Sequence, residues 1–174
     1  MLMSIDFIGL LDVTREGITL ESLLAQVLEH RSVFTYFEEH FQRFRMQEWQ
    51  VESLNPSPSQ PSLLGVGGFI IDINFQTTCI WHGARFALFT GDSSHRMALR
   101  RVCLFFAELV GSQRAIYTHE LMPYPEDECL AGIEAGLRTR IGPPAETFEE
   151  LNNAEYFGPR AWYIDTFADI RLTT

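Results

Sequence analysis

The 174-residue chain carries 23 acidic and 13 basic residues, a formal net charge of −10, and 46% of its residues are hydrophobic. This excess of acid argues against nucleic-acid binding, because phosphate contacts supply most of the affinity of such proteins. The length fits a single globular domain over residues 1–174. No apolar run approaches the roughly 20 residues that cross a bilayer, and the N-terminus lacks a signal-peptide pattern. We therefore expect a cytoplasmic protein with no membrane partner.

The chain has three cysteines, Cys79, Cys103 and Cys129, and no CxxC pair. An odd number of widely spaced cysteines favours free thiols over a disulfide framework. This pattern is typical of a protein of the reducing cytoplasm.

The first third of the chain alternates between the two secondary-structure periods. Apolar residues predict a strand over 5–13, then a long helical stretch from residue 19 or 20 to 44 that can break near Arg31-Ser32. Residues 45–54 change period and predict a strand with an irregularity. The segment 55–62 holds three prolines in eight residues, which predicts a Pro/Ser-rich surface loop.

Two alternating segments on either side of Gln76-Thr77-Thr78 predict a hairpin, with strands over 66–75 and 79–89. If those three residues form the loop, Asp72 lies opposite His82 on one face. The odd-numbered residues of both strands would then form the core face.

Thr90-Gly-Asp-Ser-Ser94 predicts a strand-to-helix turn, because Asp and Ser are good N-cap residues. The helix that follows runs to about Val110, and Gly111 is placed to end it. Residues 114–119 predict a strand. Strand, helix and strand in close succession favour a crossover between parallel strands.

In the last third, residues 125–128 open a helix that Gly142-Pro143-Pro144 stops. Residues 147–151 make a short helix at most, and 161–167 predict a final strand. Together these elements predict an α+β (or α/β) fold, with a mixed sheet of about six strands packed with three main helices.

Gly91-Asp92-Ser93 resembles the first block of the SGNH (GDSL) hydrolases, in which the serine of Gly-Asp-Ser is the nucleophile. The resemblance implies Ser93 as nucleophile, with His95 or His119 as the only available bases. The family's block lies near the N-terminus and is followed by a late Asp-x-x-His, whereas here no histidine follows His119. Helix capping by Asp92 is the competing and favoured interpretation.

The same turn could bind an anion, because helix N-termini attract phosphate and carboxylate. The candidate residues are Gly91, Ser93, Ser94 and Arg96. The chain has no Walker or GxGxxG pattern, so we predict no nucleotide cofactor. Metal binding by an Asp72–His82 pair near His119-Glu120 is a further candidate, but HExxH and HxH patterns are missing, and we predict no metal.

The absence of a nucleophile–base set leads us to expect a non-catalytic acidic protein-binding domain, an inhibitor, immunity or adaptor protein acting on a more basic protein partner. Loop aromatics, Tyr124, Tyr156 and Phe157, could contribute to the binding face. Three alternatives remain open: a small hydrolase or anion-binding enzyme using the turn Thr90–Arg96, a structural part of an assembly, and an acidity that serves solubility alone.

Overall fold

A computed structural model describes residues 5–43, 48–53, 61–74, 76–120, 122, 129–151 and 157–171. Seven strands and seven helical segments make up the described fold. The strands are β1 (Asp6–Asp12), β2 (Gln50–Glu52), β3 (Ser62–Gly65), β4 (Phe69–Ile73), β5 (Thr77–Arg85), β6 (Ala115–His119) and β7 (Tyr163–Asp165). The helical segments are α1 (Leu20–Glu29), η1 (Arg31–Phe34), α2 (Thr35–His40), α3 (Phe86–Gly91), α4 (Ser93–Val110), α5 (Leu130–Arg140) and η2 (Phe148–Glu150).

The seven strands form one sheet in the order β2-β3-β4-β5-β1-β6-β7, and all neighbouring pairs of these strands are antiparallel. The α+β prediction is confirmed, but the described sheet is antiparallel where a mixed one was expected. Strands β5 and β6 do run in the same direction on either side of the α3–α4 connection. They are not neighbours because β1, antiparallel to both, lies between them. Sequence spacing indicates relative direction and says nothing about such an insertion.

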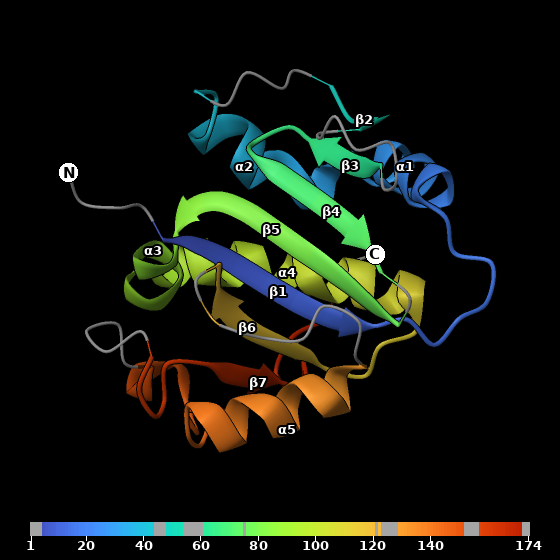
Figure 1. The fold of residues 1–174 in the computed structure, drawn as a ribbon. Helices are drawn as coiled ribbons and strands as arrows, with labels where there is room; N and C mark the ends of the chain where they lie inside the picture. The colour runs from blue at the N-terminus through green and yellow to red at the C-terminus, as the bar shows by residue number, and fades with distance from the viewer. Residues whose placement is uncertain are drawn as a thin grey trace.

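Helices cover both faces of the sheet (Figure 1). Helices α1, η1, α2 and α4 pack on one face over the larger core cluster, which includes Phe34, Phe37 and Phe106. Helix α5 covers the other face over the half that contains β1 and β6, with Trp162 fully buried beside it.

Local sequence signals set the helix ends. Thr19 and Ser22 form a capping box at the start of α1, with each side chain accepting from the other residue's backbone N–H, as the pairing of orphan amides requires. The predicted break falls between α1 and η1. Helix α4 ends at Gly111 in the left-handed conformation, where glycine meets no steric penalty.

The predicted register of the β4–β5 hairpin is wrong. Asp72 pairs with Cys79 and Ile71 with Ile80, a shift of three residues from the expected pairing. The reason is an earlier turn: β5 starts at Thr77, whose carbonyl accepts from the Asn74 N–H at 2.8 Å. Because the side-chain period is two, an odd shift turns the even-numbered residues of β5 toward the core.

Several predicted boundaries also move. The strand expected over 66–75 is preceded by an unforeseen β3, and a turn at Val66–Gly68 joins β3 to β4. Strand β5 ends at Arg85, because Phe86 and Phe89 stand at helical spacing and both are buried in α3. In the expected loop 55–62, Ser62 instead begins β3 and is buried, and residues 55–60 lie outside the described chain. Helix α5 begins at Leu130, and the acids expected to open it lie outside the described residues.

Gly67 is expected to tolerate alanine less well than Gly17, although both have the same backbone conformation, with φ of +77° and +74°. An added Cβ at Gly67 would lie 2.6 Å from the Phe37 Cβ, whereas at Gly17 nothing lies within 4 Å. The left-handed conformation alone should cost about 1–2 kcal/mol in Gly17→Ala. Crowding should add about 1–3 kcal/mol in Gly67→Ala. Urea unfolding of both variants measures the difference, and equal losses would contradict the close packing of α2 on this turn.

Candidate functional site

The turn singled out by the sequence is built as a helix start. Gly91 ends α3, and Ser93 and Ser94 are the first two residues of α4, both exposed. The Asp92 carboxylate accepts a hydrogen bond from the backbone N–H of His95 at 2.9 Å. Hydrogen bonds from the backbone amides of His95 and Ser94 lower the pKa of Asp92. A carboxylate already stabilises the positive end of the α4 dipole, so the described geometry gives the turn a capping role.

Arg96, the cation of the predicted anion site, turns back toward the protein. Its Nη1 donates to the carbonyl of Thr90 at 2.9 Å and, more weakly, to that of Phe89 at 3.5 Å. The guanidinium lies 5.1 Å from the centroid of the Phe148 ring, and Nη2 is 3.9 Å from a Glu149 oxygen. These contacts place the charge between α3 and the η2 segment.

The structure does not join the three candidate catalytic residues. Ser93 is exposed and makes no side-chain hydrogen bond to His95 or His119 among the described residues. His95 is buried, 1% exposed, and His119 is fully buried on β6. The His119 ring packs against the rings of Phe86 and Phe157. A serine hydrolase needs its base within hydrogen-bond reach of the nucleophile, and this arrangement does not supply it.

Asp72 and His82 also lie apart. Asp72 accepts a short hydrogen bond from the Ser62 hydroxyl on β3. His82 points into the core, where its Nε2 is 2.8 Å from the Gly67 carbonyl oxygen. The odd register shift that turned β5 over therefore separates the predicted pair.

A buried charge network, missed by the sequence reasoning, links α4 to the end of the chain. Arg100, 3% exposed, donates from Nε and Nη2 to both carboxylate oxygens of Asp165, at 2.7 and 3.0 Å. Asp165 also accepts from the Tyr117 hydroxyl at 2.8 Å and the Phe167 N–H at 2.9 Å. The more exposed Asp169 binds the outer edge of the guanidinium. Burial opposes the Arg100 charge, but the hydrogen bonds that Arg100 donates to both aspartates outweigh this effect and raise the pKa of Arg100.

A signal for this network exists in the sequence. Asp165 is an acid inside a short apolar strand, and Arg100 follows a buried leucine in the apolar helix 93–110. Opposite charges in two otherwise buried elements are predicted to pair with each other, because burying an unpaired charge costs much free energy. Nothing in the spacing, however, distinguishes Arg100 from its exposed neighbour Arg101.

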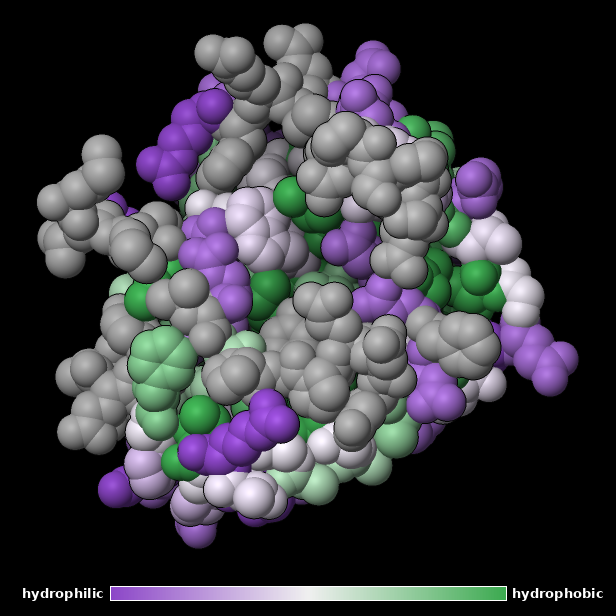
Figure 2. Space-filling view, in the orientation of Figure 1, coloured by the Kyte–Doolittle hydropathy of each residue, from purple (hydrophilic) through white to green (hydrophobic). Residues whose placement is uncertain are grey.

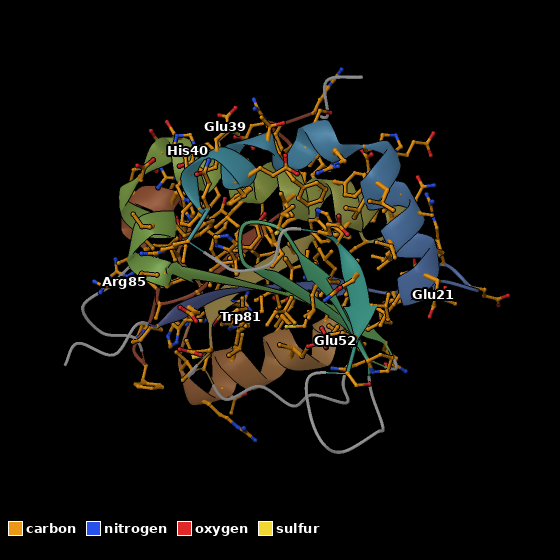
Figure 3. All side chains as sticks on the ribbon, turned by 90° about the horizontal axis from the view of Figure 1, so that it is seen from above. Glu21, Glu39, His40, Glu52, Trp81 and Arg85 are labelled. Atoms are coloured by element: carbon orange, nitrogen blue, oxygen red, sulfur yellow. The ribbon has the colours of Figure 1, made fainter. Side chains whose placement is uncertain are left out.

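Exposed acids without an ion pair gather at the end of the molecule formed by α1, α2 and β2, which we call the acidic end. Figure 3 looks down on this end and labels Glu21 on α1, Glu39 on α2 and Glu52 on β2 around it. Described residues 15–43 and 48–53 contain seven acids and three arginines, a net charge of −4, whereas all other described residues together contain 12 acids and nine arginines, a net charge of −3. The exposed acids that form no described ion pair here are Glu16, Glu21, Glu29, Glu39, Glu48 and Glu52.

Beside Glu21 the acidic end is hollowed. The hollow measures about 280 Å³ and is open to solvent. Its walls combine apolar side chains with one carboxylate: Ile18, Thr19, Leu20, Glu21, Pro61 and Ile73. Such a surface suits the apolar stem and charged head of an arginine or lysine side chain.

The exposed aromatic residue that the structure describes does not adjoin the acidic end. Phe157 is 56% exposed and stands against His119 on β6, and four strands separate β6 from β2 in the sheet. Tyr124 and Tyr156 lie outside the described residues. Large exposed hydrophobic residues of the described chain, Leu28, Leu88 and Phe157, belong to separate elements, and Figure 2 shows green and purple side chains interspersed on the α5 side. Phe157, the one described member of the predicted aromatic set, therefore lies apart from the acidic end.

In the described part of the chain, no three His, Cys, Asp or Glu side chains come together as a metal site, and no helix has the length and hydropathy to cross a bilayer. No disulfide joins the three cysteines; Cys103 is buried and Cys129 is exposed at the N-cap of α5. The chain matches no known protein family, no curated protein and no solved structure.

Proposed function

We propose that this protein binds a more basic protein through the acidic end, as an inhibitor, immunity or adaptor protein. The supporting observation is the set of six exposed carboxylates on α1, α2, β2 and the adjoining segments, none of which forms an ion pair within the described chain. Outside the acidic end, four of the nine described arginines, Arg96, Arg100, Arg114 and Arg138, each contact at least one carboxylate.

Unpaired charge of one sign on one end acts at a distance. Surface charges interact over about 8 Å at physiological ionic strength, so carboxylates on neighbouring elements produce a shared negative potential. Such a potential steers a positively charged partner into encounter and raises the association rate more than the lifetime of the complex. The hollow beside Glu21 offers the most specific contact, a place for one basic side chain of the partner.

A pull-down from native extract with the full chain should recover a protein with a basic surface. Its association rate with the recombinant chain should fall by about tenfold or more between 50 and 300 mM salt, as expected for electrostatic steering. The triple variant Glu21→Gln/Glu29→Gln/Glu39→Gln should lower the association rate at 50 mM salt by a similar factor, and Glu21→Gln alone should also shorten the lifetime of the complex. Stopped-flow or surface plasmon resonance measures both.

Glu146→Gln/Glu149→Gln/Glu150→Gln provides the matched control. It makes the same change in net charge with exposed residues in η2 and just before it, on the part of the chain that leads to the opposite edge strand. Its association rate should remain within about twofold of wild type. Equal effects of the two triple variants on the association rate would show that net charge matters and that the acidic end is not the binding site. Failure to recover any stable partner would count against binding altogether.

The two forms of the proposal differ in the fate of the partner. An inhibitor or immunity protein abolishes the partner's activity at a one-to-one ratio, whereas an adaptor leaves it intact. We place this role in the reducing cytoplasm, because disulfides are rare there and Cys79, Cys103 and Cys129 form no disulfide.

A further inference from the structure

Two buried histidines face each other beneath α2. His82 comes from the middle of β5 and His95 from the first turn of α4, and their ring centroids are 5.7 Å apart. Phe37 of α2 and Phe41, the first residue after that helix, pack against both imidazoles at centroid distances of 4.8–5.8 Å. The two phenylalanines therefore hold α2 onto the histidine pair.

The hydrogen bonds of His82 identify its protonation state. Nδ1 accepts the backbone N–H of Ala84 at 3.2 Å, so it carries a lone pair, and Nε2 donates to the Gly67 carbonyl at 2.8 Å. This is the neutral imidazole with its proton on Nε2. Protonating Nδ1 would remove the bond to Ala84. The turn at Gly67 is also the surface on which Phe37 rests.

His95 has no hydrogen-bond partner on either ring nitrogen among the described residues, although it is 1% exposed. A buried polar atom without a partner carries the full desolvation cost. Either protonation or hydrogen bonding of this ring therefore requires water to enter between α2 and α4.

The surrounding charges oppose a proton on either ring, with one exception. The α4 N-terminus and Arg43 beyond α2 are positive, and each histidine opposes charge on the other. The Asp92 carboxylate favours a proton on His95. The other titratable neighbours are Tyr36 and His40. The Tyr36 ring lies 5.9 Å from that of His95, and the exposed His40 stacks on Tyr36. Phe69 of β4 and Gly67 are also neighbours but carry no charge. Burial dominates and lowers the pKa of His82 to about 3 and of His95 to about 4.

We propose that α2 and Phe41 form a proton-sensitive segment, which lifts from α4 and the sheet when His82 or His95 takes up a proton. The segment has only six helical residues, and among its described contacts the buried rings of Phe37 and Phe41 lie directly on the two imidazoles. Lifting it exposes the imidazoles to water while the remainder of the sheet and the centre of α4 stay packed.

The sign follows from proton linkage. Both folded-state pKa values lie below the value of about 6.5 for an exposed histidine. The closed form therefore binds fewer protons than the open form at mildly acidic pH, and acid favours opening. Closure is fully stable above about pH 6.5 and weakens as the pH falls toward the folded values. The opening constant should rise tenfold per pH unit for one proton and up to a hundredfold for two.

Hydrogen exchange of the full chain, read by mass spectrometry between pH 7 and pH 4.5 and corrected for intrinsic rates, tests this behaviour. Peptides covering residues 34–43 should lose protection by at least tenfold per pH unit below pH 6, while α4 peptides covering residues 99–107 keep theirs. His95→Leu removes one titrating ring and should reduce the slope by about tenfold per pH unit. His40→Gln replaces an exposed histidine of α2 and should leave the slope unchanged.

Three results would overturn the proposal: flat exchange of residues 34–43 down to pH 4.5, simultaneous opening of the α4 centre, or equal slopes in wild type and His95→Leu. If the variant fails to fold, an NMR titration of the histidine Cε1–H signals of the wild-type chain decides instead. Two rings that titrate near pH 6.5 while residues 34–43 stay protected would likewise exclude the mechanism.

Discussion

Replacing Arg100 with methionine is expected to lower the free energy of unfolding by about 3–5 kcal/mol at pH 7. The change leaves Asp165, 2% exposed, without its two-pronged partner. Its remaining donors, the Tyr117 hydroxyl and the Phe167 N–H, do not neutralise a buried carboxylate. Urea unfolding monitored by circular dichroism measures the loss.

Two further variants separate the buried pair from ordinary surface charge. Arg138→Met removes an exposed arginine that pairs with Glu134 four residues away, and it should cost less than about 0.5 kcal/mol. Asn at position 165 still accepts from Tyr117 and Phe167, so Arg100→Met/Asp165→Asn should be clearly less destabilised than the sum of the single variants, with a coupling of about 1–3 kcal/mol. Additive losses would show that the ion pair contributes no more than packing.

Phe34→Ala is expected to have a comparable effect, about 3–5 kcal/mol. The Phe34 ring is fully buried and contacts four others: Trp49, Phe69, Phe105 and Phe106. It joins the segment between α1 and α2 to β4 and to α4, so truncation leaves a cavity at a junction of three elements. For a chain of this length the melting temperature should fall by roughly 6–20 °C, which differential scanning calorimetry measures.

Phe157→Ala is the matched comparison, because it makes the same truncation at a ring that is 56% exposed. Its expected loss is below about 0.5–1 kcal/mol, since little surface becomes newly unburied. A loss at Phe34 as small as that at Phe157 would mean that neighbouring rings collapse into the cavity, and it would contradict the rigid aromatic junction.

Much of the fold could be predicted from sequence because its causes are local. The helix from Ser93 to Val110 follows from an N-cap aspartate, a 3.6-residue apolar period and a terminal glycine. Strands β1 and β6 follow from short apolar runs between turn residues. The α+β class needs no more than the order of these segments.

The turn of the β4–β5 hairpin shows where local reasoning fails. The chain can turn either at residues 76–78 or earlier, before Thr77, and both turns preserve the alternation of each strand. The choice between them is made by the partners of β5, since β1 pairs along its whole length and requires its even-numbered face toward the core. A register choice of this kind depends on segments more than 60 residues away in sequence.

The candidate site divides in the same way. The sequence by itself determined an acidic chain, three widely spaced cysteines without a CxxC pair and a capped helix at Asp92, because composition and local spacing are enough for each. Only the tertiary structure decided that β1 separates β5 from β6, that Arg100 is buried while Arg101 is exposed, and that His95 lies beneath α2 beside His82. These features are contacts between distant segments, 65 residues apart for Arg100 and Asp165. The local pattern of one segment does not identify the distant segment that packs against it.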